Sequence, residues 1–283
     1  MSVPPSLQRP AEVRRIELPA PSGPLAALTG EPPPGVAPRP DVLLVPGYTG
    51  SKEDFLPILA PLARAGHRAT AIDLRGQYES AGPDDPAAYT VDALAKDVAA
   101  VLASLGGGVH LVGHSFGGLV TRRAVTTGSR PLSLTLLGSG PAALGGHRAA
   151  IVELMRPVIA EGGVAAIAEA SAALDREDPK MAGVPAEVTD FLRNRWLAAS
   201  PTGVLTMGAE LVTAVDEVDA LAATGVPTFV VHGEADDAWS PAVQRAMAER
   251  LGAGYAVVPG AVHSPACEAP GPLVEILLGL WSG

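Results

Sequence analysis

The sequence predicts an α/β protein with an eight-stranded, mostly parallel sheet, helices on both faces, and a helical cap inserted after the sixth strand. Short apolar runs alternate with helical patterns over most of the chain, as such a sheet requires. The alternation stops between 141 and 225, where four segments with apolar residues at helical spacing follow one another without a strand. We therefore expect a core domain formed by 1–140 and 226–283, and a cap or lid at 141–225.

Eight apolar runs are the expected strands. They are 14–18, 25–30, 41–47, 68–74, 109–113, 132–138, 227–233 and 255–260. The first two have Pro and Gly neighbours and predict an antiparallel hairpin. A Pro-rich connector, 31–40, follows them.

Helices are expected between the strands and in the cap. The core helices are 54–65, 91–104, 116–128, 241–251 and 272–281, and the cap helices are 147–162, 164–175, 186–199 and 201–214. The helix at 241–251 has the clearest start, because Ser240 is a good N-cap and Pro241 suits the first helical position.

Composition narrows the class of protein. The 283 residues are 47% hydrophobic, enough for a large core, and the net charge of −10 argues against a nucleic-acid partner. The single cysteine, Cys267, excludes an internal disulfide. We find neither an apolar run of about 18 residues nor a secretory signal, so we expect a cytoplasmic protein without a membrane span. No metal-binding motif occurs, so we expect no metal and no cofactor.

The stretch "VHLVGHSFGGLV" (109–120) is the most informative motif. Gly113-His114-Ser115-Phe116-Gly117 reads G-x-S-x-G between a predicted strand and a predicted helix. In that context a tight turn lifts the serine hydroxyl above the sheet, and the helix N-terminus points N–H groups at it. Ser115 is therefore the candidate nucleophile.

A serine nucleophile needs a histidine base and a carboxylate that orients it, in the chain order serine, acid, histidine. "VVHGEADDAWSP" supplies Glu234, Asp236 and Asp237 directly after the seventh strand. "VVPGAVHSPACEAP" supplies His263 directly after the eighth. Both loops follow strand C-terminal ends, where open α/β sheets gather their chemistry.

These motifs together resemble the α/β-hydrolase superfamily, and in particular its serine esterase and lipase-like members with a cap. "HGEADD" resembles the family stretch H-G-x-x-D, which assigns the triad acid to Asp236. Asp237 stays a rival, because a proline in this family often stands four residues after the acid, and Pro241 is four residues from Asp237. One residue is inserted in this loop, on a side that the sequence does not reveal.

The resemblance also implies an oxyanion hole made of two main-chain N–H groups. Phe116, after the nucleophile, supplies one. "VPGYTGSKEDF" (45–55) resembles the family loop H-G-x-x-G, so Tyr48 supplies the other. Pro46 stands where the family usually has histidine, so the hydrogen bonds that brace this loop must differ.

Two other features have structural interpretations. "DLRGQYESAGP" (73–83) resembles the family loop D-x-R-G-x-G-x-S, in which we expect Asp73 and Arg75 to tie strand ends together, with Tyr78 as a candidate for the pocket rim. We expect Cys267 to be a buried small residue rather than a reactive thiol. His67, His110 and His232 are assigned structural roles, and His147 has no assigned role.

Substrate contacts are expected from the tight turn at Ser115, which we call the elbow, from the loop at 45–55 and from the cap. The candidates are Tyr48, His114, Trp196 and Met207, with His114 also interpretable as a packing residue of the elbow. Further cap residues are either pocket lining or helix packing: Leu154, Met155, Val158, Ile159, Ile167, Leu192 and Leu205. Arg193 and Arg195 are candidates for binding a substrate carboxylate, but we favour a solvated helix face as the explanation for both.

We therefore expect a serine hydrolase that cleaves a small to medium, largely apolar carboxylic ester through an acyl-enzyme intermediate, as a monomer or homodimer. Within enzymes, the same triad also suits acyl transfer and hydrolysis of a thioester, lactone or C–C bond. A ligand-binding member of the fold without turnover is the alternative from another class. An epoxide hydrolase or dehalogenase is disfavoured, because those relatives carry Asp where Ser115 stands.

Overall fold

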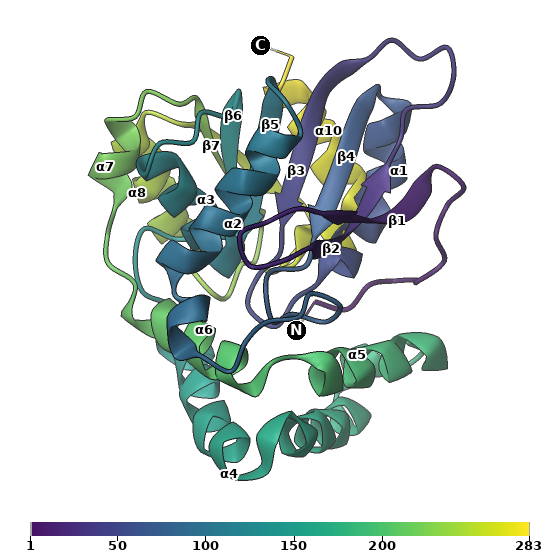
Figure 1. Cartoon of the computed structure of the whole chain (residues 1–283), viewed down its shortest axis with the longest axis vertical. Helices are drawn as coiled ribbons and strands as arrows, with labels where there is room; N and C mark the ends of the chain where they lie inside the picture. Colours follow the sequence, from purple (N-terminus) through teal and green to yellow (C-terminus); the bar gives the residue numbers. More distant parts are fainter. Residues whose placement is uncertain (1, 283) are drawn as a thin grey trace.

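The computed structural model describes residues 2–282, and its centre is one eight-stranded sheet (Figure 1). The strands are β1 (Val13–Leu18), β2 (Leu25–Gly30), β3 (Arg39–Val45), β4 (His67–Ile72), β5 (Val109–His114), β6 (Ser133–Leu137), β7 (Thr228–Gly233) and β8 (Gly254–Val258). Their order is β1-β2-β4-β3-β5-β6-β7-β8. β2 pairs antiparallel with β1 and β4, and all other pairs are parallel. The predicted fold class and hairpin are confirmed.

Ten α-helices and three short 3₁₀ helices accompany the sheet in residues 2–282. The α-helices are α1 (Leu56–Arg64), α2 (Val91–Ser104), α3 (Phe116–Thr126), α4 (Gly146–Glu177), α5 (Ala186–Ala198), α6 (Pro201–Thr213), α7 (Val218–Ala222), α8 (Pro241–Leu251), α9 (Pro265–Glu268) and α10 (Pro270–Leu280). The 3₁₀ helices are η1 (Lys52–Phe55), η2 (Pro86–Tyr89) and η3 (Pro179–Met181).

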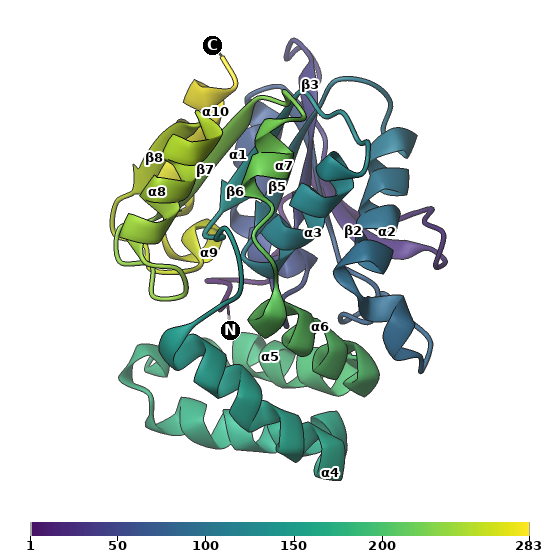
Figure 2. The ribbon, with the colours of Figure 1, turned by 90° about the vertical axis from the view of Figure 1, so that its left-hand side faces the viewer.

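The central strands are buried on both faces, as their continuous apolar sequences predicted. In β3, Leu43 and Val45 pack into the layer that contains α2, α3 and α8, whereas Val42 and Leu44 pack into the opposite layer with α1 and α10. Alternate residues of a strand point to opposite faces, so an unbroken apolar run feeds two cores at once. Figure 2 shows these helical layers from the side.

Several predicted boundaries shift by one to three residues. The third strand ends at Val45 rather than at 47, because Pro46 has no N–H for the sheet and the chain turns there. The helix expected over 54–65 begins as η1 and continues as α1 from Leu56. Four short helices, η2, η3, α7 and α9, were not predicted, since segments of three to five residues carry too little periodicity.

The region after β6 is helical up to β7, as predicted. α4 spans both segments expected at 147–162 and 164–175, and its backbone breaks at Gly163 (φ 67°, ψ −169°). Few residues other than glycine adopt that conformation, which explains the observed kink. α4, α5 and α6 lie together at one end of the sheet (Figure 1) and share a small apolar core that contains Ile159, Ile167 and Trp196.

No helix within residues 2–282 is long and apolar enough to cross a membrane. Over the same residues, no group of three or more His, Cys, Asp or Glu side chains is placed to hold a metal ion.

Candidate active site

Ser115 lies at the sharp turn between β5 and α3. Its backbone has φ 53° and ψ −119°, a strained conformation for a residue with a side chain. Close packing requires the flanking glycines: a Cβ on Gly117 would lie 2.4 Å from the Pro46 carbonyl oxygen, and one on Gly113 would lie 2.3 Å from Thr121 Oγ1. The motif therefore lets α3 press against the end of β3.

A chain of two hydrogen bonds connects three of the predicted residues. Ser115 Oγ lies 3.0 Å from His263 Nε2, and His263 Nδ1 lies 3.0 Å from Asp236 Oδ1. The residues come from the loops after β5, β8 and β7, which meet because parallel strands end at the same edge of the sheet. In this arrangement the Ser115 hydroxyl can give its proton to the His263 ring, which the Asp236 carboxylate orients.

Asp236, rather than Asp237, contacts the histidine. Asp236 is 4% exposed and also accepts hydrogen bonds from the Ala238 N–H and from Gln244 Nε2, at 3.0 and 2.9 Å. Burial acts to raise the pKa of Asp236, but the bonds from His263, Ala238 and Gln244 hold it below its usual value. Asp237 is exposed and pairs with Arg148 at 2.7 Å.

Gln244 is a site residue that sequence reasoning missed. It lies on α8, is fully buried, and donates to both Asp236 and the Trp239 carbonyl oxygen. A lone glutamine in an amphipathic helix belongs to no motif, so nothing in the sequence distinguishes it from a surface residue.

His114 packs behind the elbow. Its Nε2–H donates to the main-chain carbonyl of His263 at 2.7 Å, and it is 5% exposed. Burial and the neighbouring His263 lower the pKa of His114 to about 4, so its ring is neutral at neutral pH. It thus supports the loop that carries His263, and one part of its surface lines the cavity described below.

Of the two residues expected to form the oxyanion hole, Phe116 directly follows Ser115 in the chain and Tyr48 lines the same cavity as Ser115. Phe116 is the first residue of α3, so its N–H has no acceptor in the helix's own ladder. Gly47 and Tyr48 line the same cavity as Ser115, and a Cβ on Gly47 would lie 3.1 Å from Ser115 Cβ. The oxyanion loop, which we define as residues 46–55, therefore borders the nucleophile.

A cavity of about 560 Å³ lies above Ser115, between the core and the cap. Its cap wall is mainly apolar and includes Ile151, Val152, Met155, Ile167, Leu192 and Trp196, together with the polar residues Arg148, Ser171, Asp175 and Asp178. Of the four predicted substrate contacts, Tyr48, His114 and Trp196 line this cavity. Met207 is not among the described lining residues, because α6 turns it into the core, where it is fully buried.

The other cap candidates have different positions. Met155, Ile167 and Leu192 line the cavity, whereas Val158, Ile159 and Leu205 pack within the cap and Leu154 is 71% exposed. Helical spacing identifies the apolar face of a helix, but it does not reveal whether that face meets a cavity or another helix.

Arg195 joins the cap to the core instead of lying on a solvated face. It is 2% exposed, lies 2.7 Å from Asp54 Oδ1 in η1, and donates to the Ser2 carbonyl oxygen at 3.0 Å. Arg193, two residues earlier on α5, is exposed. The solvated-face interpretation is therefore wrong for Arg195, which is paired with the protein's own carboxylate.

The loop after β4 is structural, as expected for Asp73 and Arg75. Asp73 is fully buried and accepts from the N–H and from Nζ of Lys52, at 2.7 and 2.8 Å. Arg75 pairs with Asp97 of α2 at 2.6 Å. Tyr78 packs edge-on against Phe191 and is not among the described residues that line the cavity above Ser115.

The remaining expectations concern buried residues. His67, His110 and His232 form hydrogen bonds inside the core, to the Pro40 carbonyl, Ser133 and Tyr255 respectively. Cys267 is buried and donates to the Asp54 carbonyl at 3.2 Å, and burial raises the pKa of its thiol. Such a thiol is inert at neutral pH.

Comparison with known proteins agrees with this architecture. A model described as "Alpha/beta hydrolase family" matches residues 42–276. The chain belongs to the α/β-hydrolase family.

Among solved structures, this α/β hydrolase is similar to a carboxylesterase from the thaumarchaeon Nitrososphaera gargenis (21% identity, TM-score 0.74, 94% of this chain and 98% of that chain). It is also similar to a thermophilic esterase from Thermogutta terrifontis, solved with malate bound (23% identity, TM-score 0.74, 95% and 98%). At these identities the likeness concerns the fold.

One curated relative matches over a shorter stretch. The "Putative carbamate hydrolase RutD" of Variovorax paradoxus (strain S110) is 40% identical over 100 residues, which is 35% of this chain. The matched part spans 37% of that relative's length, little more than a third. The likeness to this relative thus concerns about a third of each chain.

Proposed function

We propose that this α/β hydrolase is a serine esterase that cleaves carboxylic esters of small to medium size through an acyl-enzyme intermediate. The observation that supports it most is the hydrogen-bond chain Ser115–His263–Asp236, with Ser115 at the floor of a cavity. We also propose that 141–225 acts as a cap over a core formed by 1–140 and 226–283.

In the proposed mechanism, Ser115 Oγ attacks the ester carbonyl while His263 Nε2 takes its proton. The tetrahedral intermediate places a negative oxygen near the N–H groups of Phe116 and Tyr48, each of which contributes about 3 kcal/mol of transition-state stabilisation. His263 then gives the proton to the leaving alcohol. A water molecule, activated by the same ring, hydrolyses the acyl-enzyme.

Asp236 keeps His263 in the tautomer that presents Nε2 as a base. Its lowered pKa keeps it ionised at neutral pH, so it stabilises the imidazolium formed in each step. Gln244 holds the second carboxylate oxygen and so fixes the direction of the first.

The apolar cap wall and the cavity volume suit a substrate with a largely hydrocarbon acyl or alcohol part. A carbamate is a second candidate, because the curated relative carries that name and a carbamate carbonyl accepts the same attack. Acyl transfer and the hydrolysis of a thioester, a lactone or a C–C bond would use the same triad. The substrate panel described below distinguishes these reactions from ester hydrolysis. The cytoplasmic location and the monomeric or homodimeric state stay predictions.

The first test uses a fluorophosphonate probe on the wild type and on Ser115→Ala, with intact mass as the readout. We expect one adduct on the wild type and none on the variant, because only an activated serine is phosphonylated. No adduct on either protein would contradict the esterase proposal and favour a ligand-binding member of the fold. A panel of esters, lactones, thioesters, carbamates and diketones, assayed with and without an added acyl acceptor, then assigns the substrate class.

A further inference from the structure

We propose that Gln77 is a positioning residue for the oxyanion hole, because it fixes the peptide plane that carries the Tyr48 N–H. This inference rests on the proposed esterase function. Gln77 belongs to the loop after β4, in a stretch that the sequence indicated to be structural, and it touches neither Ser115 nor His263.

Both ends of the Gln77 side chain are engaged. The residue is 2% exposed, its Nε2 donates to the Gly47 carbonyl oxygen at 2.8 Å, and its Oε1 accepts from the Leu74 N–H at 3.2 Å. The opposite amide orientation would face oxygen with oxygen and N–H with N–H, so these two contacts determine the orientation.

The contact with Gly47 has a direct effect on Tyr48, because the two groups share one peptide bond. The Gly47 carbonyl and the Tyr48 N–H belong to the same plane and, in a trans peptide, point in opposite directions. A donor that holds the carbonyl therefore holds the N–H on the opposite side. The Gly50 N–H donates to the same carbonyl at 3.1 Å. Two donors on one carbonyl also polarise the peptide and strengthen its N–H as a donor.

The oxyanion loop needs such a brace from outside. Pro46 stands where the family usually has histidine, and a proline side chain offers no hydrogen bond. Thr49 has a positive φ of 56°, which costs free energy unless neighbouring contacts hold the turn. Gln77 supplies a contact at the residue beside the proline.

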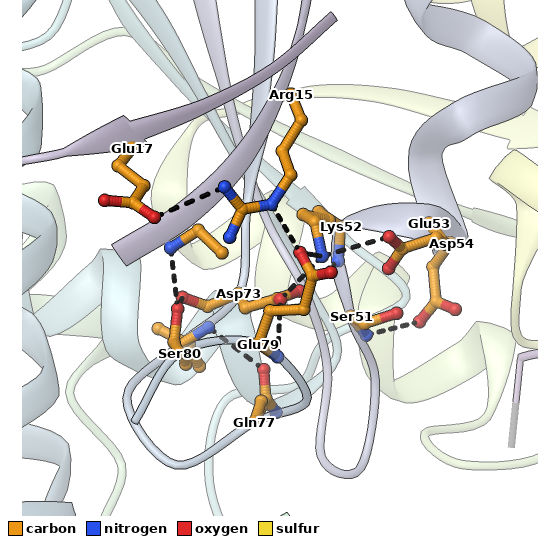
Figure 3. A network of polar contacts seen from close by, with 12 residues as sticks. Arg15, Glu17, Ser51, Lys52, Glu53, Asp54, Asp73, Gln77, Glu79 and Ser80 are labelled. Carbon is orange, nitrogen blue, oxygen red and sulfur yellow. Dashed lines mark hydrogen bonds and ion pairs between the residues drawn. The ribbon is translucent and has the colours of Figure 1, made fainter. Parts of the chain in front are cut away.

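A second anchor holds the other end of the same loop. Lys52 is 1% exposed and pairs with Asp73, Glu53 and Glu79 at 2.8, 3.0 and 2.9 Å (Figure 3). Burial opposes its charge, but Asp73 and Glu53 raise the pKa of Lys52. The loop after β4 thus contacts the oxyanion loop at Gly47 and at Lys52. These two contacts hold the oxyanion loop in its conformation.

The test compares an oxygen ester with its thionoester, in which sulfur replaces the carbonyl oxygen. A formed oxyanion hole favours the oxygen ester, because sulfur is larger and accepts hydrogen bonds weakly. The ratio of the two kcat values therefore reports on the oxyanion hole and not on overall stability. The variants are Gln77→Met, which removes the donor, and Gln77→Glu, which keeps the shape and replaces the NH₂ group by oxygen.

We expect Gln77→Met to lower kcat for the oxygen ester by roughly tenfold to a hundredfold, with KM little changed. The thionoester rate should fall much less, so the ratio of kcat values falls. Gln77→Glu should regain part of the ratio at acidic pH, where a protonated carboxyl can donate to the Gly47 carbonyl. Both substrates use the same Ser115, His263 and Asp236, so a change in turnover that affects both equally cancels in the ratio.

Ser80→Ala is the matched control. Ser80 lies in the same loop, is buried, and bonds to the Asp73 carbonyl and the Ala26 N–H without touching Gly47. Ser80→Ala should lower the melting temperature and leave the ratio of the two kcat values unchanged. At neutral pH, a ratio of kcat values equal to the wild-type ratio in a folded Gln77→Met or Gln77→Glu protein would overturn the inference while the esterase proposal stands. A wild type without ester turnover and without a fluorophosphonate adduct would overturn both.

Discussion

At the scale of single residues, the environment decides the role of each histidine. His263 lies at the cavity with Ser115 on one ring nitrogen and Asp236 on the other. His114, the neighbour of the serine in sequence, is buried and bonded to a main-chain carbonyl. The same side chain is therefore a candidate base in one place and a neutral support in the other.

The two adjacent aspartates give the sharpest residue-scale prediction. Asp236→Asn should lower kcat by roughly 10⁴-fold, because the amide favours the wrong tautomer of His263. Asp237→Asn should change kcat by less than about twofold, since Asp237 only pairs with Arg148 at the surface. Steady-state kinetics on one ester checks both variants. If Asp237→Asn lost more kcat than Asp236→Asn, the triad acid would be Asp237.

At the scale of elements, the site is assembled by loops that follow strands, and the cap is fastened by buried polar contacts. Arg195 of α5 reaches Asp54 of η1, which belongs to the oxyanion loop. Burial raises the pKa of Asp54, and the pairing with Arg195 offsets part of that effect. Asp54 also lines the cavity above Ser115, so the ion pair joins α5 of the cap to the cavity wall.

This contact predicts different effects for two arginines on one helix. Arg195→Met should lower the free energy of unfolding by about 3–5 kcal/mol, because it leaves the Asp54 charge buried without its partner. Arg193→Met, at an exposed position, should stay within about 0.5 kcal/mol of the wild type. Urea unfolding measures both.

Adding Asp54→Asn to Arg195→Met is the internal control for this pair. The double variant should recover part of the lost stability, because no buried charge then lacks a partner. Equal effects of Arg193→Met and Arg195→Met would contradict the assignment of the ion pair.

At the scale of the whole molecule, buried histidines link stability to pH. Burial lowers the pKa of His110 and of His114 to about 4 each, from about 6.5 in an unfolded chain. Between these values the unfolded chain binds more protons than the folded protein, so the free energy of unfolding decreases as the pH falls. Above pH 6.5 their contribution is constant.

Replacing His110 by Phe isolates one of these groups, because stacking against Trp281 can persist while the titration is lost. The free energy of unfolding should fall less between about pH 7 and about pH 4.5 in His110→Phe than in the wild type. The difference between the two falls should be up to about 3 kcal/mol. The loss of the hydrogen bond to Ser133 lowers the free energy of unfolding of His110→Phe equally at both pH values, so it does not affect the pH dependence. Parallel pH curves for the two proteins would contradict the prediction.

Much of the fold follows from the sequence, and less of the site does. Strand positions could be predicted because buried parallel strands are apolar throughout, and the kink at Gly163 matches a gap between two predicted helical segments. Met207 packs in the core instead of lining the cavity above Ser115, because helical spacing does not show whether an apolar helix face meets a cavity or the core. Gln77 and Gln244 could not be found, since no sequence pattern shows that the side chain of Gln77 reaches the Gly47 carbonyl or that the side chain of Gln244 turns inward to Asp236.

The sequence alone therefore determined the fold class, the family, and the candidate residues Ser115 and His263, because local patterns of apolar residues and glycines encode strands and turns. The tertiary structure decided that Asp236 and not Asp237 contacts His263, that Arg195 is buried against Asp54, and that Gln77 holds the Gly47 peptide. The physical reason is that hydrogen bonds and ion pairs depend on distances of about 3 Å between loops far apart in the chain. Residue identity limits which groups can pair, and packing selects the pairs that form.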